Sequence, residues 1–273
     1  MPHVLANDGV RLFYEEAGKG RPLVLIHGWS FSGRFFARSV PALARRARVV
    51  VPDLRGHGRS DKSGHGHRVA CLAADLRDLL AALDLRDATL LGWSLGCPVI
   101  WSFLELFGRD RVRSVVLVEQ TPRQCKAPDW PYWHKQCHDQ ASLDAMLDRM
   151  RADPPRFDEQ NLLSCLRKPP AEGEKRALLA EMALAPLGAR AATMADHTAH
   201  DWRDLLPHLD IPALVLVARR DQVFPWQGPA WVGERMPNAR TVFFEESSHA
   251  LFLDEPEKFE AAVAEFIDRP AAP

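Results

Sequence analysis

The stretch Leu90-Leu91-Gly92-Trp93-Ser94-Leu95-Gly96 sets a serine in a Gly-X-Ser-X-Gly frame directly behind an apolar run. Residues 88–91 predict a buried strand, and residues 97–104 predict a buried helix. A strand that becomes a helix within a couple of residues holds the serine between them in a strained conformation with its hydroxyl exposed, and the two glycines leave room for the close approach. The stretch therefore predicts a sharp turn that presents the Ser94 hydroxyl.

Strands and helices alternate on both sides of this turn. Four continuous apolar runs are typical of strands buried on both faces: residues 22–26, 49–51, 114–118 and 213–217. Apolar spacing predicts helices at residues 35–46, 72–83, 229–236 and 256–267, and further strands are expected at residues 4–6, 10–16 and 241–244, the first two as a hairpin. Such alternation predicts an α/β fold with a mostly parallel sheet of about eight strands flanked by helices.

The alternation stops between residues 121 and 207. This part is rich in proline, charged and aromatic residues and contains no convincing strand. Helical spacing is present near residues 142–150, 161–166 and 175–184. We therefore predict one core domain made of residues 1–120 and 208–273, with a helical cap (lid) at residues 121–207 inserted between two of its strands.

Composition narrows the class of protein. The 273 residues are 47% hydrophobic, which is enough for one large domain with a full core, and a formal net charge of -1 gives no basic surface for nucleic acid or for an anionic membrane. No apolar run approaches the length of a membrane helix, and the first residues do not resemble a secretion signal. Five cysteines without paired spacing argue against a disulfide framework. We expect a cytoplasmic protein that acts on a small molecule, and a homodimer is compatible with the sequence.

Two polar residues at the ends of later strands are candidate partners for Ser94. Asp221 follows the strand at residues 213–217, and His249 follows the strand at residues 241–244. The carboxyl ends of parallel strands meet at one edge of a sheet, where such folds carry their chemistry. An imidazole there can take the serine proton, and a carboxylate can fix the tautomer of the imidazole and stabilise its charged form. The order Ser, Asp, His along the chain is the order used with this type of serine turn.

Several motifs together resemble the α/β-hydrolase superfamily over essentially the whole chain, and in particular its branch of cofactor-free haloperoxidases, esterases and lactonases. They are His27-Gly28-Trp29, the loop Asp53-Leu54-Arg55-Gly56-His57-Gly58-Arg59-Ser60, the run from Leu83 to Gly92, and Ser248-His249. The resemblance implies an oxyanion hole made by the backbone N–H groups of Trp29 and Leu95, and no cofactor. The chain departs from many relatives at Cys97, where they have a second glycine, and at Arg219 and Arg220, where they have a glycine before the acid.

The acid is the least certain of the three catalytic candidates, because Glu119 ends the strand that follows the serine helix and competes with Asp221 for this role. His27 and His57 sit in turns flanked by glycine, and the resemblance implies structural roles for both.

Aromatic residues predict the character of the substrate pocket. Trp93 lies beside Ser94 in the sequence, and Trp130 and Trp133 stand near the start of the predicted cap, so we expect these three to line an apolar cavity. The cysteines and histidines of the cap contain no compact Cys-X-X-Cys pair, and we expect no metal site.

The chemistry expected from these residues is hydrolysis of a carboxylic ester or lactone of a small, largely apolar substrate through an acyl-enzyme intermediate on Ser94. The same three residues are compatible with hydrolysis of a carbon–carbon bond, or with perhydrolysis, in which peroxide replaces water. A ligand receptor built on the hydrolase fold, with little turnover, is the alternative from a different class.

Overall fold

The computed structural model of the protein describes residues 2–269. At its centre β5 (Ala88–Trp93), which is buried at every position, leads into α3 (Gly96–Phe107), as the apolar pattern predicts. The sheet has the order β1-β2-β4-β3-β5-β6-β7-β8, so β5 lies in its middle. β1 and β2, and β2 and β4, pair antiparallel, whereas every other neighbouring pair is parallel.

The remaining strands have bounds close to the predicted ones, and the predicted mostly parallel sheet of about eight strands is confirmed. They are β1 (His3–Leu5), β2 (Arg11–Ala17), β3 (Pro22–Ile26), β4 (Arg48–Pro52), β6 (Val112–Val118), β7 (Ala213–Ala218) and β8 (Ala239–Phe244).

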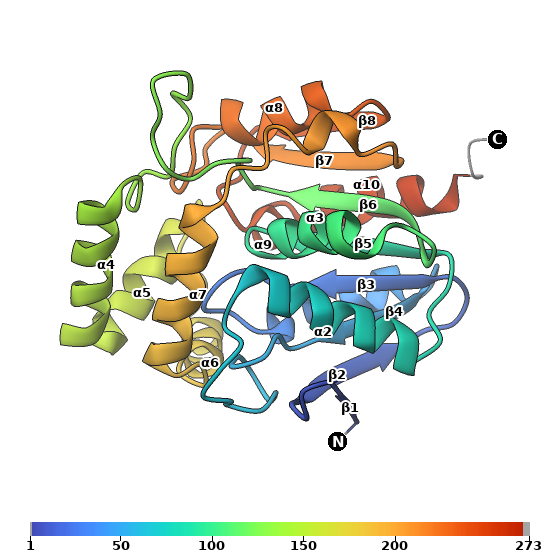
Figure 1. Ribbon diagram of the computed structural model, residues 1–273, viewed down its shortest axis with the longest axis horizontal. Coiled ribbons are helices and arrows are strands. Elements are labelled where there is room, and N and C mark those ends of the chain that lie inside the picture. Colours follow the sequence, from blue (N-terminus) through green and yellow to red (C-terminus); the bar gives the residue numbers. More distant parts are fainter. Residues whose placement is uncertain (1, 270–273) are drawn as a thin grey trace.

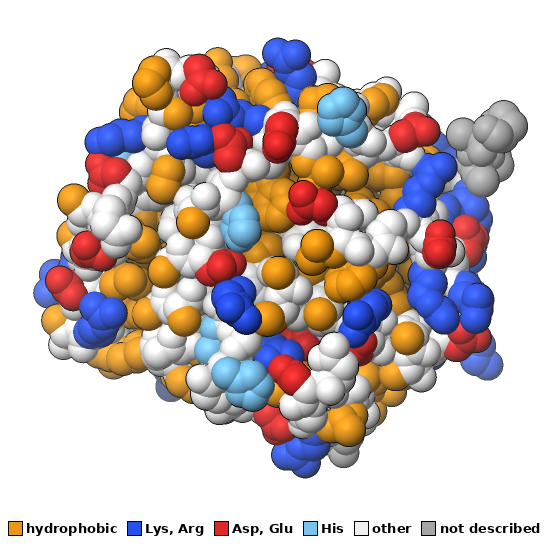
Figure 2. Space-filling view, viewed as in Figure 1, with side chains coloured by type: hydrophobic (Ala, Val, Ile, Leu, Met, Phe, Trp, Pro, Cys, Tyr) orange, Lys and Arg blue, Asp and Glu red, His pale blue; other side chains and the backbone are white. Residues whose placement is uncertain are grey.

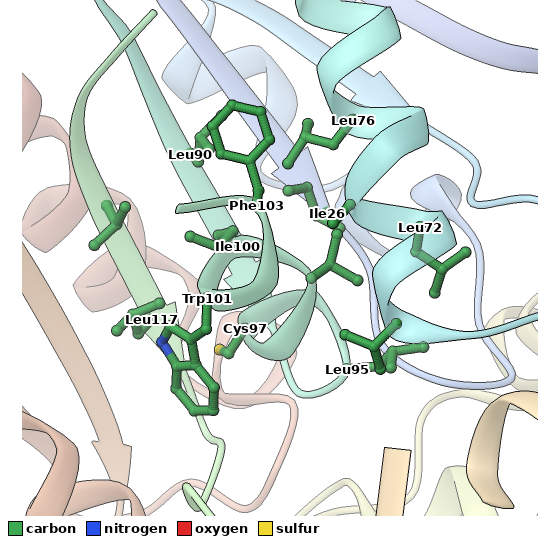
Figure 3. Packing of buried hydrophobic residues seen from close by; sticks show 14 of the residues in the cluster. Ile26, Leu72, Leu76, Leu90, Leu95, Cys97, Ile100, Trp101, Phe103 and Leu117 are labelled. Atoms are coloured by element: carbon green, nitrogen blue, oxygen red, sulfur yellow. The ribbon is translucent and has the colours of Figure 1, made fainter. Parts of the chain in front are cut away.

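Side-chain alternation along the strands divides the core in two. In β3, Val24 and Ile26 belong to one apolar cluster, and Leu23 and Leu25 to the other, because successive residues of a strand point to opposite faces of the sheet. The first face is covered by α2 (Val69–Ala82), α3 and α8 (Gln227–Arg235). Figure 3 shows Ile100 and Phe103 of α3 meeting Leu90 of the sheet beside the side chains of α2.

The opposite face is covered by shorter elements and by the last helix. These are η1 (Gly33–Phe36), α1 (Val40–Leu43), α9 (Leu251–Asp254) and α10 (Pro256–Asp268). One continuous helix over residues 35–46 was expected here, and that prediction is wrong. Pro41 explains the break, because its ring lacks an N–H and would clash with the carbonyl of Ala37 in a continuous helix, so the new helix begins with Pro41 in its first turn.

Four helices lie between β6 and β7, and in Figure 1 they stack at the end of the sheet where the parallel strands finish. They are α4 (Gln140–Ala152), α5 (Pro154–Ser164), α6 (Glu172–Met182) and α7 (Leu187–Ala199). We call residues 119–212 the inserted segment. Sequence patterning missed α7 and placed the start of α5 too late. The division into a core and a cap at residues 121 and 207 stays a prediction, and Met1 and residues 270–273 of that core lie outside the described residues.

The surface carries acidic and basic side chains side by side over the face drawn in Figure 2, without a large area of one sign. In residues 2–269, none of the helices is long and apolar enough to cross a membrane. A short 3-10 helix, η2 (Leu206–His208), precedes β7. All five cysteines are free thiols.

Candidate active site

Ser94 stands at the turn from β5 to α3 with a left-handed backbone, φ 52°. The turn is crowded on both sides. A Cβ atom at Gly92 would lie 2.5 Å from the carbonyl oxygen of Gly96, and one at Gly96 would lie 2.4 Å from the carbonyl oxygen of Ile26. Only glycine fits at these two positions, so the frame is required by the geometry of the turn. The strained serine is what this type of turn is expected to produce.

His249 lies in the loop after β8, and its Nδ1 is 3.1 Å from Oδ2 of Asp221, which follows β7. Both side chains are almost fully buried. The other carboxylate oxygen of Asp221 accepts the backbone N–H of Val223 at 2.7 Å. The indole of Trp93 donates to the carbonyl of His249 at 2.9 Å and thereby fixes the backbone that carries the imidazole. The structure therefore joins Asp221 and His249, as the chain order predicts.

Glu119, the competing acid, ends β6 and is completely buried with a left-handed backbone, φ 48°. Its Oε1 accepts the backbone N–H of Ala218. Burial, together with the nearby charge of Asp221, raises the pKa of Glu119 well above the usual range of a carboxyl. Burial acts in the same direction on Asp221, but the charge and the hydrogen bond of His249 outweigh it and lower the pKa of Asp221. Glu119 is thus the protonated member of the pair, and Asp221 is the ionised one.

Glu119, Asp221 and His249 also form the one group of three buried ligand-type residues, within residues 2–269, whose ligand atoms all lie within 4.8 Å of one another. These atoms could offer three ligands to a metal ion. The oxygens of Asp221 are already used by His249 and by the N–H of Val223, and an ion would displace the hydrogen bond between imidazole and carboxylate. The arrangement therefore fits an oriented imidazole better than a metal centre.

Ser94 and His249 line one cavity, which lies between the sheet and the inserted segment. Its walls combine aromatic side chains with neutral polar ones. The other lining residues are Trp29, Phe31, Gln124, His134, Gln136, Met146, Phe157, Asn161, Ser164, Cys165, Met194, His197, Val223 and Phe224.

The three tryptophans expected in this cavity do not line it. Trp93 is completely buried beneath it, with its ring stacked on Phe31 at a centroid distance of 4.6 Å. Trp130 packs edge-on against Trp231 at 5.5 Å, and Trp133 lies near His138. The alternation of side chains along β5 explains why Trp93 is buried. Its side chain points to the face of the sheet opposite to Leu90, into the apolar cluster that also contains Leu23 and Leu25.

The role of Trp29 and Leu95 as an oxyanion hole stays a prediction. Leu95 follows the serine directly and is the N-cap residue of α3, where the first backbone N–H groups of a helix have no partner within the helix. The chain before Trp29 passes close to the serine, since a Cβ atom at Gly28 would lie 3.2 Å from Cβ of Ser94. The Trp29 indole donates to the carbonyl of Arg190 in α7 at 2.7 Å, which ties this loop to the inserted segment.

His27 and His57 hold loops in place. Nε2 of His27 accepts the backbone N–H of Leu54 at 3.0 Å, and Nε2 of His57 accepts that of Ser30 at 3.3 Å. Burial lowers the pKa of both rings, so each is a neutral hydrogen-bond acceptor. Neither ring lines the cavity.

Sequence reasoning missed most of the polar cavity wall. His134, Asn161 and His197 belong to this wall. The loop of His134 has no periodic pattern, and α7, which carries His197, is rich in alanine and has no side-chain cap at its start. Val223 and Phe224 could have been predicted to line the cavity, because they follow Asp221 by only two and three residues.

Comparison with known proteins places the chain among hydrolases. Residues 21–177 match the family described as alpha/beta hydrolase fold. A non-heme chloroperoxidase from Kitasatospora aureofaciens is 31% identical, with 98% of this chain and 100% of that protein aligned. A pimeloyl-[acyl-carrier protein] methyl ester esterase from Chromobacterium violaceum is 32% identical over 96% of this chain and 100% of the relative.

A solved structure is similar throughout. The esterase from Exiguobacterium antarcticum superposes with a TM-score of 0.93 at 26% identity, and the alignment covers 98% of this chain and 99% of that one. The chain therefore belongs to the α/β-hydrolase fold family, in its branch of cofactor-free haloperoxidases and esterases.

Proposed function

We propose that this protein is a serine hydrolase that cleaves a carboxylic ester or lactone of a small, uncharged substrate through an acyl-enzyme intermediate. One observation carries the proposal: a serine held at a strained turn lines the same cavity as a buried histidine whose Nδ1 is hydrogen-bonded to a buried aspartate. A serine, a base and an oriented acid are the three groups that nucleophilic acyl transfer requires.

The proposed reaction begins when Nε2 of His249 takes the proton of Ser94 and the serine oxygen attacks the substrate carbonyl. The backbone N–H groups of Trp29 and Leu95 stabilise the oxyanion, an interaction typically worth about 3 kcal/mol per donor. The tetrahedral intermediate collapses, and the alcohol leaves with the proton from His249. Water, activated by the same imidazole, then attacks the acyl-enzyme and releases the acid.

We assign the acid role to Asp221. It accepts from Nδ1 of His249, and its lowered pKa keeps it ionised, which is the state that stabilises an imidazolium. Glu119 is protonated, accepts the backbone N–H of Ala218 and shares a side-chain hydrogen bond with Asp221, so it stabilises the ionised form of Asp221. The raised pKa of Glu119 supports this division of roles, since two carboxylates so close together cannot both be ionised.

The inserted segment acts as the cap of the site in this proposal. Gln124, Met146, Phe157, Asn161 and Met194 of this segment form much of the cavity wall, so the segment determines which substrate fits. The esterase names of the Chromobacterium violaceum relative and of the Exiguobacterium antarcticum structure agree with ester hydrolysis.

The direct test is steady-state and pre-steady-state hydrolysis of p-nitrophenyl butyrate by the wild type and by Ser94→Ala. Sustained turnover in the wild type that falls by roughly 10⁴-fold or more in the variant supports the proposal. A burst of one equivalent of p-nitrophenol without turnover supports the receptor alternative. Equal activity in both proteins would contradict any role of Ser94.

Perhydrolysis is a second candidate function, because two relatives bear the name non-heme chloroperoxidase. Hydrogen peroxide would replace water in the last step and release a peracid with regeneration of the serine hydroxyl. Adding peroxide at constant acyl donor, and measuring peracid against carboxylic acid, distinguishes the two reactions.

A further inference from the structure

The ring of His134 has a fixed tautomer. Its Nδ1 accepts two backbone N–H groups, from Gln136 at 3.0 Å and from Cys137 at 3.1 Å. Burial lowers the pKa of His134 to about 3, so the ring is neutral over the physiological range and carries one proton. A nitrogen that accepts two N–H groups cannot hold that proton. The proton is therefore on Nε2, and this nitrogen is a hydrogen-bond donor.

The donor on His134 faces the cavity without a protein acceptor. The side chain is 8% exposed and lines the cavity, and no residue in the described part of the chain accepts a hydrogen bond from Nε2. The ring is held in place by Phe224, which meets it edge-on at 5.1 Å. A donor fixed by two backbone contacts and one ring contact is already oriented for an acceptor in the cavity.

Asn161 supplies a second donor, from α5. Its Nδ2 is buried and has no acceptor among residues 2–269, and its side chain also lines the cavity. A buried donor without an acceptor costs about 1–3 kcal/mol, so such groups are rare unless water or a ligand satisfies them. Together with Nε2 of His134, it gives the cavity two donors without a protein acceptor in the described residues, and these indicate a ligand with an acceptor atom besides the reacting carbonyl.

The cavity wall carries no formal charge besides that of the catalytic groups. None of its lining side chains, as far as the structure describes the chain, is a lysine, arginine, aspartate or glutamate. His197, on α7, is kept neutral by burial, which lowers its pKa to about 3. A carboxylate on the substrate would lose its solvation here without gaining a counter-ion. The aromatic rings of Trp29, Phe31 and Phe157 favour an apolar chain instead.

From these contacts we infer that the preferred substrate is an uncharged ester or lactone whose acyl chain carries a second acceptor oxygen, which His134 and Asn161 bind through their side-chain N–H groups. The inference rests on the proposed ester hydrolysis and adds the substrate class. Both residues act as specificity determinants in this inference, because each lines the cavity of Ser94 and offers an N–H group to the bound substrate.

The test compares p-nitrophenyl hexanoate with its 4-oxo and 5-oxo derivatives, which have the same chain length and differ by one carbonyl oxygen. Each kcat/KM is divided by the rate constant of alkaline hydrolysis of the same ester, so that differences in intrinsic reactivity cancel. We expect one oxo ester to exceed the plain ester by roughly tenfold, the effect of one well-placed hydrogen bond. The monoester p-nitrophenyl hydrogen glutarate should be the poorest substrate of the series.

Two variants assign the preference to the named residues. His134→Asn keeps an acceptor oxygen close to the position of Nδ1 for the N–H groups of Gln136 and Cys137, but lacks the donor of Nε2. Asn161→Leu removes the second donor at similar volume. We expect each variant to reduce the ratio of oxo to plain ester by roughly three- to tenfold. His138→Asn, on the same loop outside the cavity lining, is the matched control and should leave the ratio unchanged.

The outcomes separate this inference from the proposed function. Ester turnover that depends on Ser94, with equal normalised rates for plain and oxo esters, would overturn the inference and leave the hydrolase proposal standing; water would then satisfy the two donors. A preference that survives in both His134→Asn and Asn161→Leu would overturn the assignment to these residues. Absence of turnover with every ester would contradict both. Thermal unfolding of each variant confirms that it is folded, and either variant alone suffices for the test.

Discussion

Backbone strain marks the residues around the candidate site. Ser30, Ser94 and Glu119 have left-handed backbones although none is glycine, and they lie in the segments that follow β3, β5 and β6; the other two such residues in the described chain, Asp84 and Asp87, lie before β5. Such conformations cost about 1–3 kcal/mol each and persist where the surrounding structure enforces them. At Ser94 and Glu119 the strain places a hydroxyl and a carboxyl that a relaxed backbone would direct elsewhere.

Replacing each of the two buried acids beside His249 by its amide should change kcat to very different extents. Glu119→Gln replaces a protonated carboxyl by a neutral group of similar shape that can still donate a hydrogen bond, so kcat should fall by less than about tenfold. Asp221→Asn removes the charge that stabilises the imidazolium and should lower kcat by about 10⁴-fold. Steady-state kinetics on one ester measures both. The reverse ranking would make Glu119 the acid.

Strand ends are what made the candidate catalytic residues predictable. Ser94, Asp221 and His249 each follow an apolar run that could be recognised without a structure, and parallel strands bring their ends together. The choice between Glu119 and Asp221 was not predictable, because both follow strands and only side-chain geometry shows which one reaches His249. The prediction that Trp93 lines the cavity was wrong for a similar reason. Every residue of β5 is buried, so its composition does not show to which face of the sheet Trp93 points.

At the scale of elements, the turn between β5 and α3 depends on the absence of a side chain at Gly96. A methyl group there would meet the carbonyl oxygen of Ile26 at 2.4 Å, and that oxygen belongs to a buried strand that cannot move aside. Only two residues separate the strand from the helix, so neither element can adjust alone.

Gly96→Ala should therefore lower the free energy of unfolding by roughly 3 kcal/mol or more, because overpacking beside a rigid strand is among the costly substitutions. Urea-induced unfolding followed by far-ultraviolet circular dichroism measures the change. Gly173→Ala is the matched control in α6, where an added Cβ meets nothing within 4 Å and the variant should be equally stable or slightly more stable. Equal stability of both variants would show that the turn tolerates a side chain.

Helices of the inserted segment were harder to predict than those of the core. α4 has an N-terminal capping box between Asp139 and Ser142, whereas α7 has Pro186 as its N-cap residue, has no side-chain cap, and is rich in alanine. The position of α7 is determined by tertiary contacts, such as the hydrogen bond from the Trp29 indole to the carbonyl of Arg190. Packing of this kind cannot be inferred from the local sequence.

For the whole molecule, buried neutral histidines make stability dependent on pH. The folded-state pKa values of His134 and His197 are about 3, well below the ordinary value near 6.5 that applies in the unfolded chain. Between these values the unfolded chain binds more protons, so acidification shifts the equilibrium toward it. The stabilisation is fully present above about pH 6.5 and is lost as the pH falls toward 3.

Urea-induced unfolding between pH 7 and pH 4 should thus show a steady loss of unfolding free energy as the pH falls. His197→Gln should flatten that dependence by roughly 2 kcal/mol over the range, because one buried group no longer takes up a proton on unfolding. His208→Gln, at an exposed position, is the control and should keep the wild-type slope. A slope unchanged by His197→Gln would show that this ring is not the source.

The whole-molecule architecture was predictable, because buried apolar runs separated by amphipathic helices leave few alternatives to a parallel sheet covered on both faces. The cavity was not, because its polar wall is assembled from a loop and from α5 and α7, whose side chains meet only in the folded chain. Substrate selectivity is therefore the property for which the structure adds most to the sequence.

The acyl-enzyme itself provides the most direct test of the account. The wild type and Ser94→Ala are mixed with p-nitrophenyl butyrate, quenched with acid within milliseconds, and digested for peptide mass spectrometry. We expect a butyryl group on the peptide that contains Ser94 in the wild type, formed at the rate of the p-nitrophenol burst, and no butyrylated peptide in the variant. Turnover without an adduct, or an adduct on another residue, would contradict the role given to Ser94.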